Sequence, residues 1–205
     1  MVVDPKLIGI SGKIGNGKDL LFDVINYIVT EDYWTSFEHY MHESTPVDVI
    51  YQNKKFAGIL KDITCKLIGC NVSQLEDREF KEAELGREWN GLTPRKILQL
   101  LGTEAGRQII HPNIWVNALF ANFATNSKWI VTDVRFPNEA NIIKEKGGIM
   151  IRINRPGTES HCGGQHLSET SLDAYDKFDY VIENDGTVQD LIDKVKSLNI
   201  VKRIL

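Results

Sequence analysis

Eight residues near the N-terminus have the composition and spacing of a phosphate-binding loop. Residues 12–19 read Gly-Lys-Ile-Gly-Asn-Gly-Lys-Asp and lie between a short apolar run and a stretch with helical periodicity. Glycines let successive backbone N–H groups point at a polyphosphate without interference from a Cβ atom. The start of a following helix adds partial positive charge, and Lys18 can reach the β- and γ-phosphates. This order predicts nucleotide binding, against the alternative of a glycine-rich turn that binds nothing.

Asp19 stands where loops of this kind usually carry Ser or Thr, whose hydroxyl group binds magnesium. A carboxylate is a hard oxygen ligand and can bind Mg²⁺ directly or through water. Its negative charge beside the phosphates makes the cation more necessary. We therefore expect Asp19 to be the magnesium ligand of the loop.

A second group of charged residues follows the apolar run at 129–132. Asp133 comes directly after this run, Arg135 two residues later, and Glu139 at the start of a helical pattern. In open parallel sheets, ligands bind beyond the carboxyl ends of the strands. In phosphate-loop proteins, an acid at this position lies near magnesium or the substrate. The alternative for Asp133 is a helix cap or an acidic residue of a loop.

A third group lies in the last irregular loop, which carries Arg152, Arg155, His161, Cys162 and His166. The His and Cys residues could bind zinc, but their spacing fits no strong zinc pattern. The other interpretation is a lid that brings Arg155 over the phosphates.

Two arginines occur on one predicted helical stretch, which begins at Thr93 and Pro94. Arg95 lies at the start of this helix, where a bound anion is favoured. Arg107 has the equal alternative of a solvated or ion-paired surface residue. Gly102 and Thr103 have low helix propensity, so they weaken the predicted helix. Close approach of a ligand or of another backbone segment would explain their presence.

Composition limits the classes of protein to be considered. The chain has 205 residues, of which 42% are hydrophobic and 25% charged, as is usual for a globular domain. A net charge of −4 argues against nucleic acid as the main partner. No apolar run approaches the roughly 18 residues of a membrane span, and the N-terminus lacks the apolar core of a signal peptide. Three cysteines without a Cys-x-x-Cys pair suit a reducing cytoplasm.

The apolar periodicity alternates between strands and helices. Strands are predicted at 7–10, 47–51, 129–133, 149–153 and 180–182. Helices are predicted at 18–29, 55–69, 93–105, 138–146 and 188–198, and within 109–123 after His111 and Pro112. The charged segment 72–85 is a solvated helix or a mobile excursion. This alternation predicts an α/β fold, in which a parallel sheet has helices on both faces.

Three motifs together resemble the deoxynucleoside monophosphate kinases of tailed phages. They are residues 12–19, the segment 93–104 with Thr-Pro-Arg-Lys and Leu-Leu-Gly-Thr-Glu, and residues 130–139, Ile-Val-Thr-Asp-Val-Arg-Phe-Pro-Asn-Glu. His-Leu-Ser-Glu at 166–169 is similar to a late motif of the same kinases. The resemblance runs from Leu7 to about Val195 and is weakest over 30–88. These kinases also carry Asp after the Gly-Lys of the loop.

The resemblance implies transfer of the ATP γ-phosphate to a deoxynucleoside monophosphate with magnesium. ATP would be held by Lys13, Ile14, Gly15, Asn16, Gly17, Lys18 and Asp19. The acceptor would be held by Arg95, Gly102, Thr103, Trp115, Asp133, Arg135 and Glu139. For Trp115, a buried core residue is an equal alternative. The sequence of residues 184–187 primarily indicates a turn followed by the start of a helix. In such a kinase, the same place can line the adenine pocket.

We therefore predict one P-loop kinase domain over 1–205, with a helical acceptor-binding region near 54–125 and a lid near 155–172. Lys18, Asp133, Arg135 and Arg155 are the predicted catalytic residues. The expected partners are small nucleotides, and we expect no binding to nucleic acid or to membranes. The resemblance admits a homodimer, located in the cytoplasm of a host. Two rival hypotheses are a kinase of another small acceptor and an ATP-binding switch or packaging accessory without acceptor chemistry.

Overall fold

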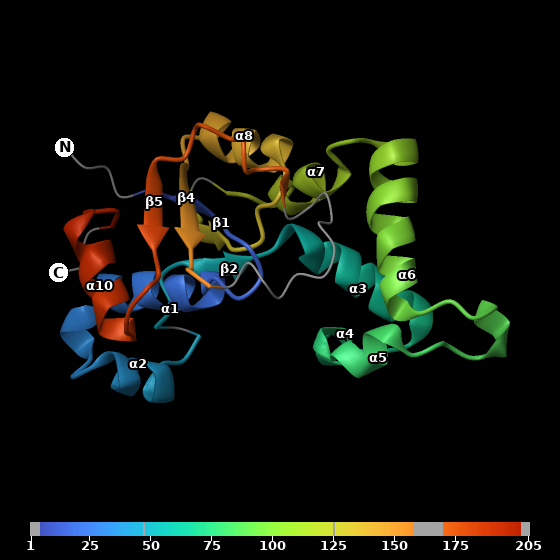
Figure 1. Ribbon diagram of the computed structural model, residues 1–205, viewed down its shortest axis with the longest axis horizontal. Helices are drawn as coiled ribbons and strands as arrows, with labels where there is room; N and C mark the ends of the chain where they lie inside the picture. The colour runs from blue at the N-terminus through green and yellow to red at the C-terminus, as the bar shows by residue number, and fades with distance from the viewer. Residues whose placement is uncertain (1–4, 47, 125, 158–169, 202–205) are drawn as a thin grey trace. The chain divides into compact units, whose positions relative to one another are not determined.

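The computed structural model describes residues 5–46, 48–124, 126–157 and 170–201. The chain divides into two compact units (Figure 1). The first comprises Met1–Lys54 and Ala124–Leu205 and contains the sheet, and the second, Lys55–Phe123, is helical. The single domain and its lid stay a prediction.

Among the described residues of the first unit, five strands form one parallel sheet. Its order is β2-β3-β1-β4-β5. The strands are β1 Leu7–Ser11, β2 Gln52–Lys54, β3 Trp129–Val131, β4 Ile149–Asn154 and β5 Tyr180–Glu183. β1 pairs in parallel with both β3 and β4, with Ile8 opposite Ile130 and Ile149. The predicted α/β fold with a parallel sheet is confirmed.

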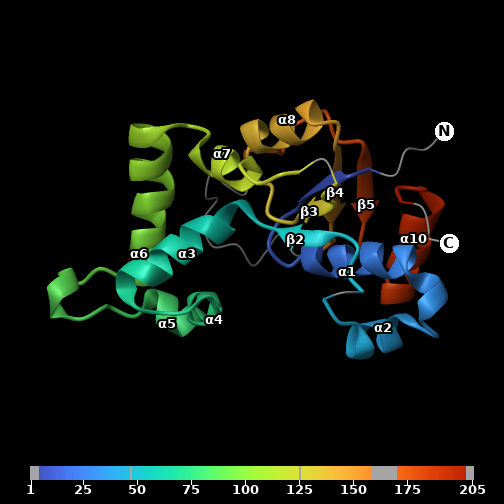
Figure 2. The same cartoon turned by 180° about the vertical axis from the view of Figure 1, so that it is seen from behind.

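Helices cover both faces of this sheet. They are α1 Lys18–Val29, α8 Pro137–Glu145 and α10 Val188–Ser197. The 3₁₀ turn η1 Glu31–Tyr33 follows α1, and α2 Phe37–Glu43 packs against α1. α8 lies on one face, while α1 and α10 lie side by side on the other (Figure 2). Because the side chains of a strand alternate between faces, β4 sends Met150 toward α8 and Ile151 toward α1.

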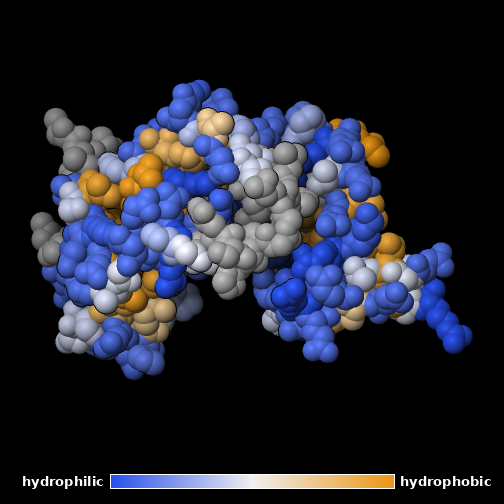
Figure 3. Space-filling model, viewed as in Figure 1, coloured by the Kyte–Doolittle hydropathy of each residue, from blue (hydrophilic) through white to orange (hydrophobic). Residues whose placement is uncertain are grey.

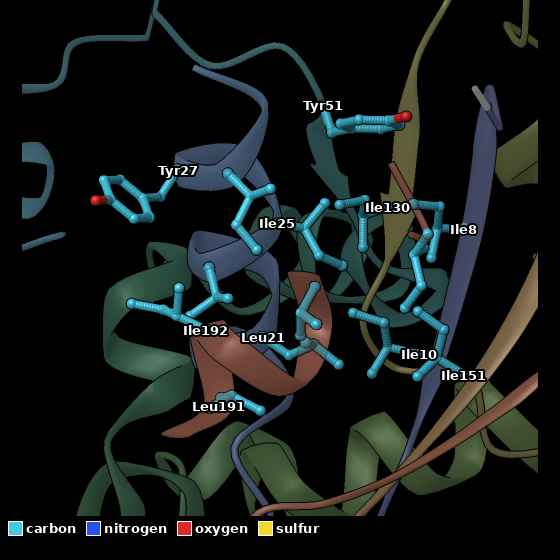
Figure 4. Packing of buried hydrophobic residues seen from close by; sticks show 14 of the residues in the cluster. Ile8, Ile10, Leu21, Ile25, Tyr27, Tyr51, Ile130, Ile151, Leu191 and Ile192 are labelled. Carbon is cyan, nitrogen blue, oxygen red and sulfur yellow. The ribbon is translucent and has the colours of Figure 1, made fainter. Parts of the chain in front are cut away.

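The main core lies between the sheet and the helices α1 and α10 (Figure 4). Ile8, Ile10 and Ile151 of the strands pack against Leu21 of α1 and Leu191 of α10, and all are at most 1% exposed. Full burial of such a side chain contributes about 1.5–3 kcal/mol. This packing holds the first turn of α1 in place at the end of β1, where the glycine-rich loop lies.

The second predicted strand, 47–51, is wrong over 48–51, the part of it that the structure describes. The apolar run suggests a strand, but Asp48 closes a turn by donating its N–H to the Thr45 carbonyl over 2.9 Å. The Tyr51 N–H donates to Oδ1 of Asn26 over 2.8 Å, a side chain rather than a neighbouring strand. Strand pairing begins only at Gln52, whose N–H donates to the Lys128 carbonyl.

The second unit is built of short helices. They are α3 Phe56–Ile68, α4 Val72–Glu76, α5 Arg78–Glu82, the 3₁₀ turn η2 Arg87–Trp89, α6 Pro94–Gln99, the π-helix η3 Leu100–Ile110 and α7 Ile114–Phe120. The predicted helix start is confirmed, since the Thr93 hydroxyl accepts from the Lys96 N–H over 3.1 Å. α3 is followed by Gly69, whose φ of 71° lies in the left-handed region that commonly terminates helices.

The surface is mostly hydrophilic on the face that Figure 3 displays, with scattered hydrophobic patches. Large exposed apolar side chains include Val181 on β5 and Ile109 on η3. Along the described ranges, every helix is too short or too polar to span a bilayer.

Candidate active site

The glycine-rich loop connects β1 to α1 and has the backbone geometry that its sequence requires. Gly15 and Gly17 have φ values of 83° and 95°, which side chains with a Cβ atom rarely adopt. The Asn16 N–H donates to the Lys13 carbonyl over 3.2 Å and closes the turn. The predicted order of strand, loop and helix is therefore present.

Lys18, the first residue of α1, bends back over the loop. Its Nζ donates to the carbonyl of Gly12 over 2.7 Å and to that of Lys13 over 2.9 Å. The side chain is partly buried, so its ammonium group is held at the loop rather than extended into solvent. A phosphate bound at the loop would meet this charge directly.

The loop also rests on the carboxyl ends of β4 and β5. Asn16 is 3% exposed, and its Nδ2 donates to the Ile153 carbonyl over 2.9 Å. Asn184, which follows β5, donates its own Nδ2 to the Asn16 carbonyl over 3.0 Å. A Cβ atom at position 12 would lie 2.5 Å from the Ile153 carbonyl oxygen, so Gly12 allows this close approach.

Two carboxylates lie one helical turn apart at the start of α1. Asp19 is exposed, and Asp23 is about half buried. Burial, and secondly the charge of Asp19, raise the pKa of Asp23 to about 6. The exposed Asp19 carboxylate beside the phosphate loop is a hard oxygen donor, which fits Mg²⁺ with water and phosphate as its remaining ligands.

Replacing Asp23 by Asn should stabilise the protein at neutral pH. Because the folded pKa lies above the ordinary value of 3.8, this carboxyl group destabilises the fold as the pH rises from about 4 to about 6. Asp23→Asn should gain about 1 kcal/mol at pH 7.5 after solvent screening, or about 2–4 °C in Tm.

The measurement is thermal unfolding of both proteins between pH 4 and 8, without Mg²⁺ and nucleotide. The gain should shrink as the pH falls through 6 and vanish near 4. A gain that is the same at all pH values would contradict the assigned cause.

The segment after β3 lies against the end of β1. The Val134 N–H donates to the Ile10 carbonyl over 3.3 Å, which brings Asp133 and Arg135 to the edge of the sheet from which the loop emerges. Glu139 is 2% exposed, and its Oε2 accepts from the N–H groups of Arg135 and Phe136 over 2.9 and 3.1 Å. Glu139 therefore caps α8 and fixes the backbone that carries Arg135, while its contact with an acceptor stays a prediction.

Arg152 on β4 is held by the protein itself. Its Nη1 donates to the Ser11 hydroxyl over 3.2 Å, and its Nη2 donates to the Asp173 carboxylate over 2.8 Å. Its guanidinium carbon lies 5.9 Å from the centre of the Phe178 ring. These contacts place its charge beside the end of β1.

Arg155 is exposed just after β4. His161, Cys162 and His166, like most of the predicted lid, lie outside the described residues. Within the described residues, no three His, Cys, Asp or Glu side chains form a group that could hold a metal.

In the second unit, the predicted acceptor residues have partners within that unit. Arg95 donates its Nε to Oε1 of Glu82. The Gly102 carbonyl accepts from Nε1 of Trp115 over 2.8 Å and from Nη1 of Arg107 over 3.0 Å. Trp115 is buried, and a Cβ atom at Gly102 would lie 2.8 Å from Cδ2 of Leu60.

Packing thus explains Gly102 and Trp115, whereas Thr103 is exposed. The role of these residues in acceptor binding stays a prediction. At the carboxyl edge of the sheet in the first unit, the structure brings together the loop, Asp133, Arg135 and Arg152.

Sequence reasoning missed two features of this edge. The first is the side-chain contact of Asn184 with the loop, and the second is the effect of the Asp19 charge on the pKa of Asp23. The signal for Asn184 was its position directly after an apolar strand. The signal for Asp23 was its spacing of four residues from Asp19, which places both on one helix face.

Comparisons with a protein-family model and with individual proteins indicate the same family. The family model described as "Deoxynucleotide monophosphate kinase" matches residues 47–195. A putative deoxynucleotide monophosphate kinase of Acanthamoeba polyphaga mimivirus is 32% identical over 158 residues, which are 70% of this chain and 80% of that protein.

Matches to phage proteins are shorter. The deoxynucleoside-5'-monophosphate kinase of Escherichia phage T5 is 46% identical over 56 residues, which cover 26% of this chain and 22% of the phage protein. The deoxynucleotide monophosphate kinase of Enterobacteria phage T4 is 29% identical over 108 residues, 50% of this chain and 44% of that protein. The chain thus spans less than half the length of these phage relatives.

Proposed function

Since this chain belongs to the deoxynucleotide monophosphate kinase family, we propose that it transfers the γ-phosphate of ATP to a deoxynucleoside monophosphate. The products are a deoxynucleoside diphosphate and ADP. The observation that carries the proposal is the position of Lys18, whose ammonium group lies over the loop carbonyls at the edge that also holds Asp133 and Arg135.

Residues of the loop hold the donor in this proposal. Backbone N–H groups within residues 13–19, apart from that of Asn16, which closes the turn, bind the β- and γ-phosphates of ATP. Lys18 exchanges its carbonyl partners for phosphate oxygens. Phosphoryl transfer has a loose transition state, so the protein contributes mainly position and charge. The buried contacts of Leu21 keep the start of α1 fixed while the ligand changes.

Magnesium is held by Asp19 in this proposal, with water and phosphate oxygens as further ligands. When bound, Mg²⁺ would offset the negative charge of the phosphates. The neighbouring carboxyl group of Asp23, whose pKa is raised to about 6 by burial and by Asp19, adds to the negative potential at this end of α1.

Arg135 anchors the acceptor phosphate in this proposal, while acceptor binding by Arg95, Gly102, Thr103 and Trp115 stays a separate prediction. An oxygen of the acceptor phosphate forms a bond to the γ-phosphorus, and the bond to the β–γ bridging oxygen breaks. The electron pair of that bond leaves with ADP. No general base is required, because the attacking oxygen is already anionic at neutral pH, and Asp133 orients the acceptor. Arg155 brings further positive charge to the phosphates.

Turnover with a panel of acceptors tests this function. The purified protein, ATP and Mg²⁺ are mixed with each common deoxynucleoside monophosphate, each ribonucleoside monophosphate and a set of sugars, and release of ADP is followed. We expect stimulation by at least one deoxynucleoside monophosphate. Stimulation by another class of acceptor alone would support the rival kinase, and tight ATP binding without stimulation would support a switch. The homodimer and the cytoplasmic location stay predictions.

A further inference from the structure

Asn184 connects the last strand of the sheet to the glycine-rich loop, across 168 positions of sequence. Its backbone is fixed because its N–H donates to the Asn154 carbonyl over 2.7 Å, which extends the pairing of β5 with β4. Its side chain reaches the Asn16 carbonyl over 3.0 Å, and the residue is 7% exposed. The amide therefore has a defined position from which to act on the loop.

Two asparagine amides hold the same turn of the loop. Asn184 donates to the carbonyl of Asn16, and the Asn16 amide donates to the carbonyl of Ile153 over 2.9 Å. Since both acceptors are carbonyl oxygens, each amide must present its nitrogen. The two bonds attach the turn to the ends of β5 and β4.

The contact with Asn184 determines which way the next N–H group points. A trans peptide is planar, so the carbonyl of Asn16 and the N–H of Gly17 point in opposite directions. With this carbonyl held toward Asn184, the Gly17 N–H points away from Asn184. Within the described residues, no backbone carbonyl accepts from this N–H. A Cβ atom at position 17 would lie 2.6 Å from Nδ2 of Asn184, so glycine also permits the contact.

We propose that Asn184 is a positioning residue for ATP, which orients the peptide between Asn16 and Gly17 so that its N–H faces the phosphates. This inference rests on the proposed binding of ATP at the loop. Without the amide, the Asn16 carbonyl loses the donor that Asn184 supplies, and the peptide orientation that binds phosphate becomes less stable. The effect should fall on the affinity for ATP rather than on the acceptor.

Two substitutions and one control separate this role from general stabilisation. Asn184→Ala removes the donor without adding charge, and Asn184→Asp keeps the shape but leaves only acceptor atoms facing the Asn16 carbonyl. The control is Asn154→Ala at the adjacent strand end, where the amide donates to the Glu183 carboxylate over 2.9 Å instead of to the loop.

The experiment measures the Kd for ATP by calorimetry below the melting temperature of each variant, together with KM for ATP and for the acceptor. Both Asn184 variants should weaken ATP binding about tenfold or more, with the acceptor KM within twofold of wild type. Asn154→Ala should bind ATP as the wild type does.

Two results would overturn the proposal: ATP affinity within twofold of wild type in both variants, whether or not Tm is lowered, or equal increases in both KM values. Failure of the proposed function is distinguishable, because it would appear as absence of diphosphate product with the wild-type protein. The Kd for ATP needs no acceptor and still tests Asn184.

Discussion

Lys18→Ala should lower kcat by about 10³-fold or more while the protein stays folded. The ammonium group lies 2.7 and 2.9 Å from the Gly12 and Lys13 carbonyl oxygens, so it is already positioned where the β- and γ-phosphates are expected. Its removal takes away the positive charge that compensates the transferring group. The measurement is steady-state turnover with ATP, Mg²⁺ and the best acceptor.

The fold should survive this substitution, because the loop has other supports. The buried Leu21 and the bond from Asn16 to Ile153 do not depend on the lysine. Circular dichroism and Tm should therefore match the wild type. Lys177→Ala, at an exposed lysine of the same unit, is the matched control and should leave kcat unchanged. A kcat of Lys18→Ala within tenfold of wild type would contradict the role of this lysine.

Arg135→Ala should reduce kcat/KM for the acceptor by about 10³–10⁵-fold, equivalent to about 4–7 kcal/mol. Its backbone N–H is fixed by the Glu139 carboxylate, and the adjacent Val134 is bonded to the end of β1. A guanidinium group placed in this way can bind a phosphate through two parallel hydrogen bonds. Turnover measured over a range of acceptor concentrations separates binding from catalysis.

Two further variants sharpen this test. Arg135→Lys keeps the charge but loses the forked geometry, so it should recover only part of the activity. Arg78→Ala, at an exposed arginine of α5, should be nearly silent. If Arg135→Ala retains near-normal turnover, the acceptor phosphate is held elsewhere.

Local sequence patterns predicted most elements of the fold. The helix at 18–29 has the predicted bounds, because its apolar residues recur at helical spacing and Gly17 precedes it. The strand predicted at 47–51 failed for a reason that no local pattern contains. There the Tyr51 backbone bonds to the Asn26 side chain, 25 residues earlier, and strand pairing starts one residue later.

The candidate site shows the same division between local and distant information. The loop was recognisable because glycine spacing and Lys18 are contiguous in sequence, and the acid after β3 was recognisable from the apolar run before it. The hydrogen-bond partners of Glu139 and Trp115 could not be predicted from the sequence. Their residue types alone do not distinguish contact with a ligand from a hydrogen bond to the backbone. The contact of Asn184 with Asn16 depends on the order of strands in the sheet.

The most direct test of the proposed function follows the phosphoryl group itself. The protein is incubated with Mg²⁺, a deoxynucleoside monophosphate and ATP labelled with ¹⁸O in its γ-phosphoryl group, and the products are identified by mass spectrometry. We expect the label in the terminal phosphoryl group of the deoxynucleoside diphosphate, with one ADP formed for each diphosphate. Label released only as inorganic phosphate, at the same rate with and without the acceptor, would contradict the proposed phosphoryl transfer.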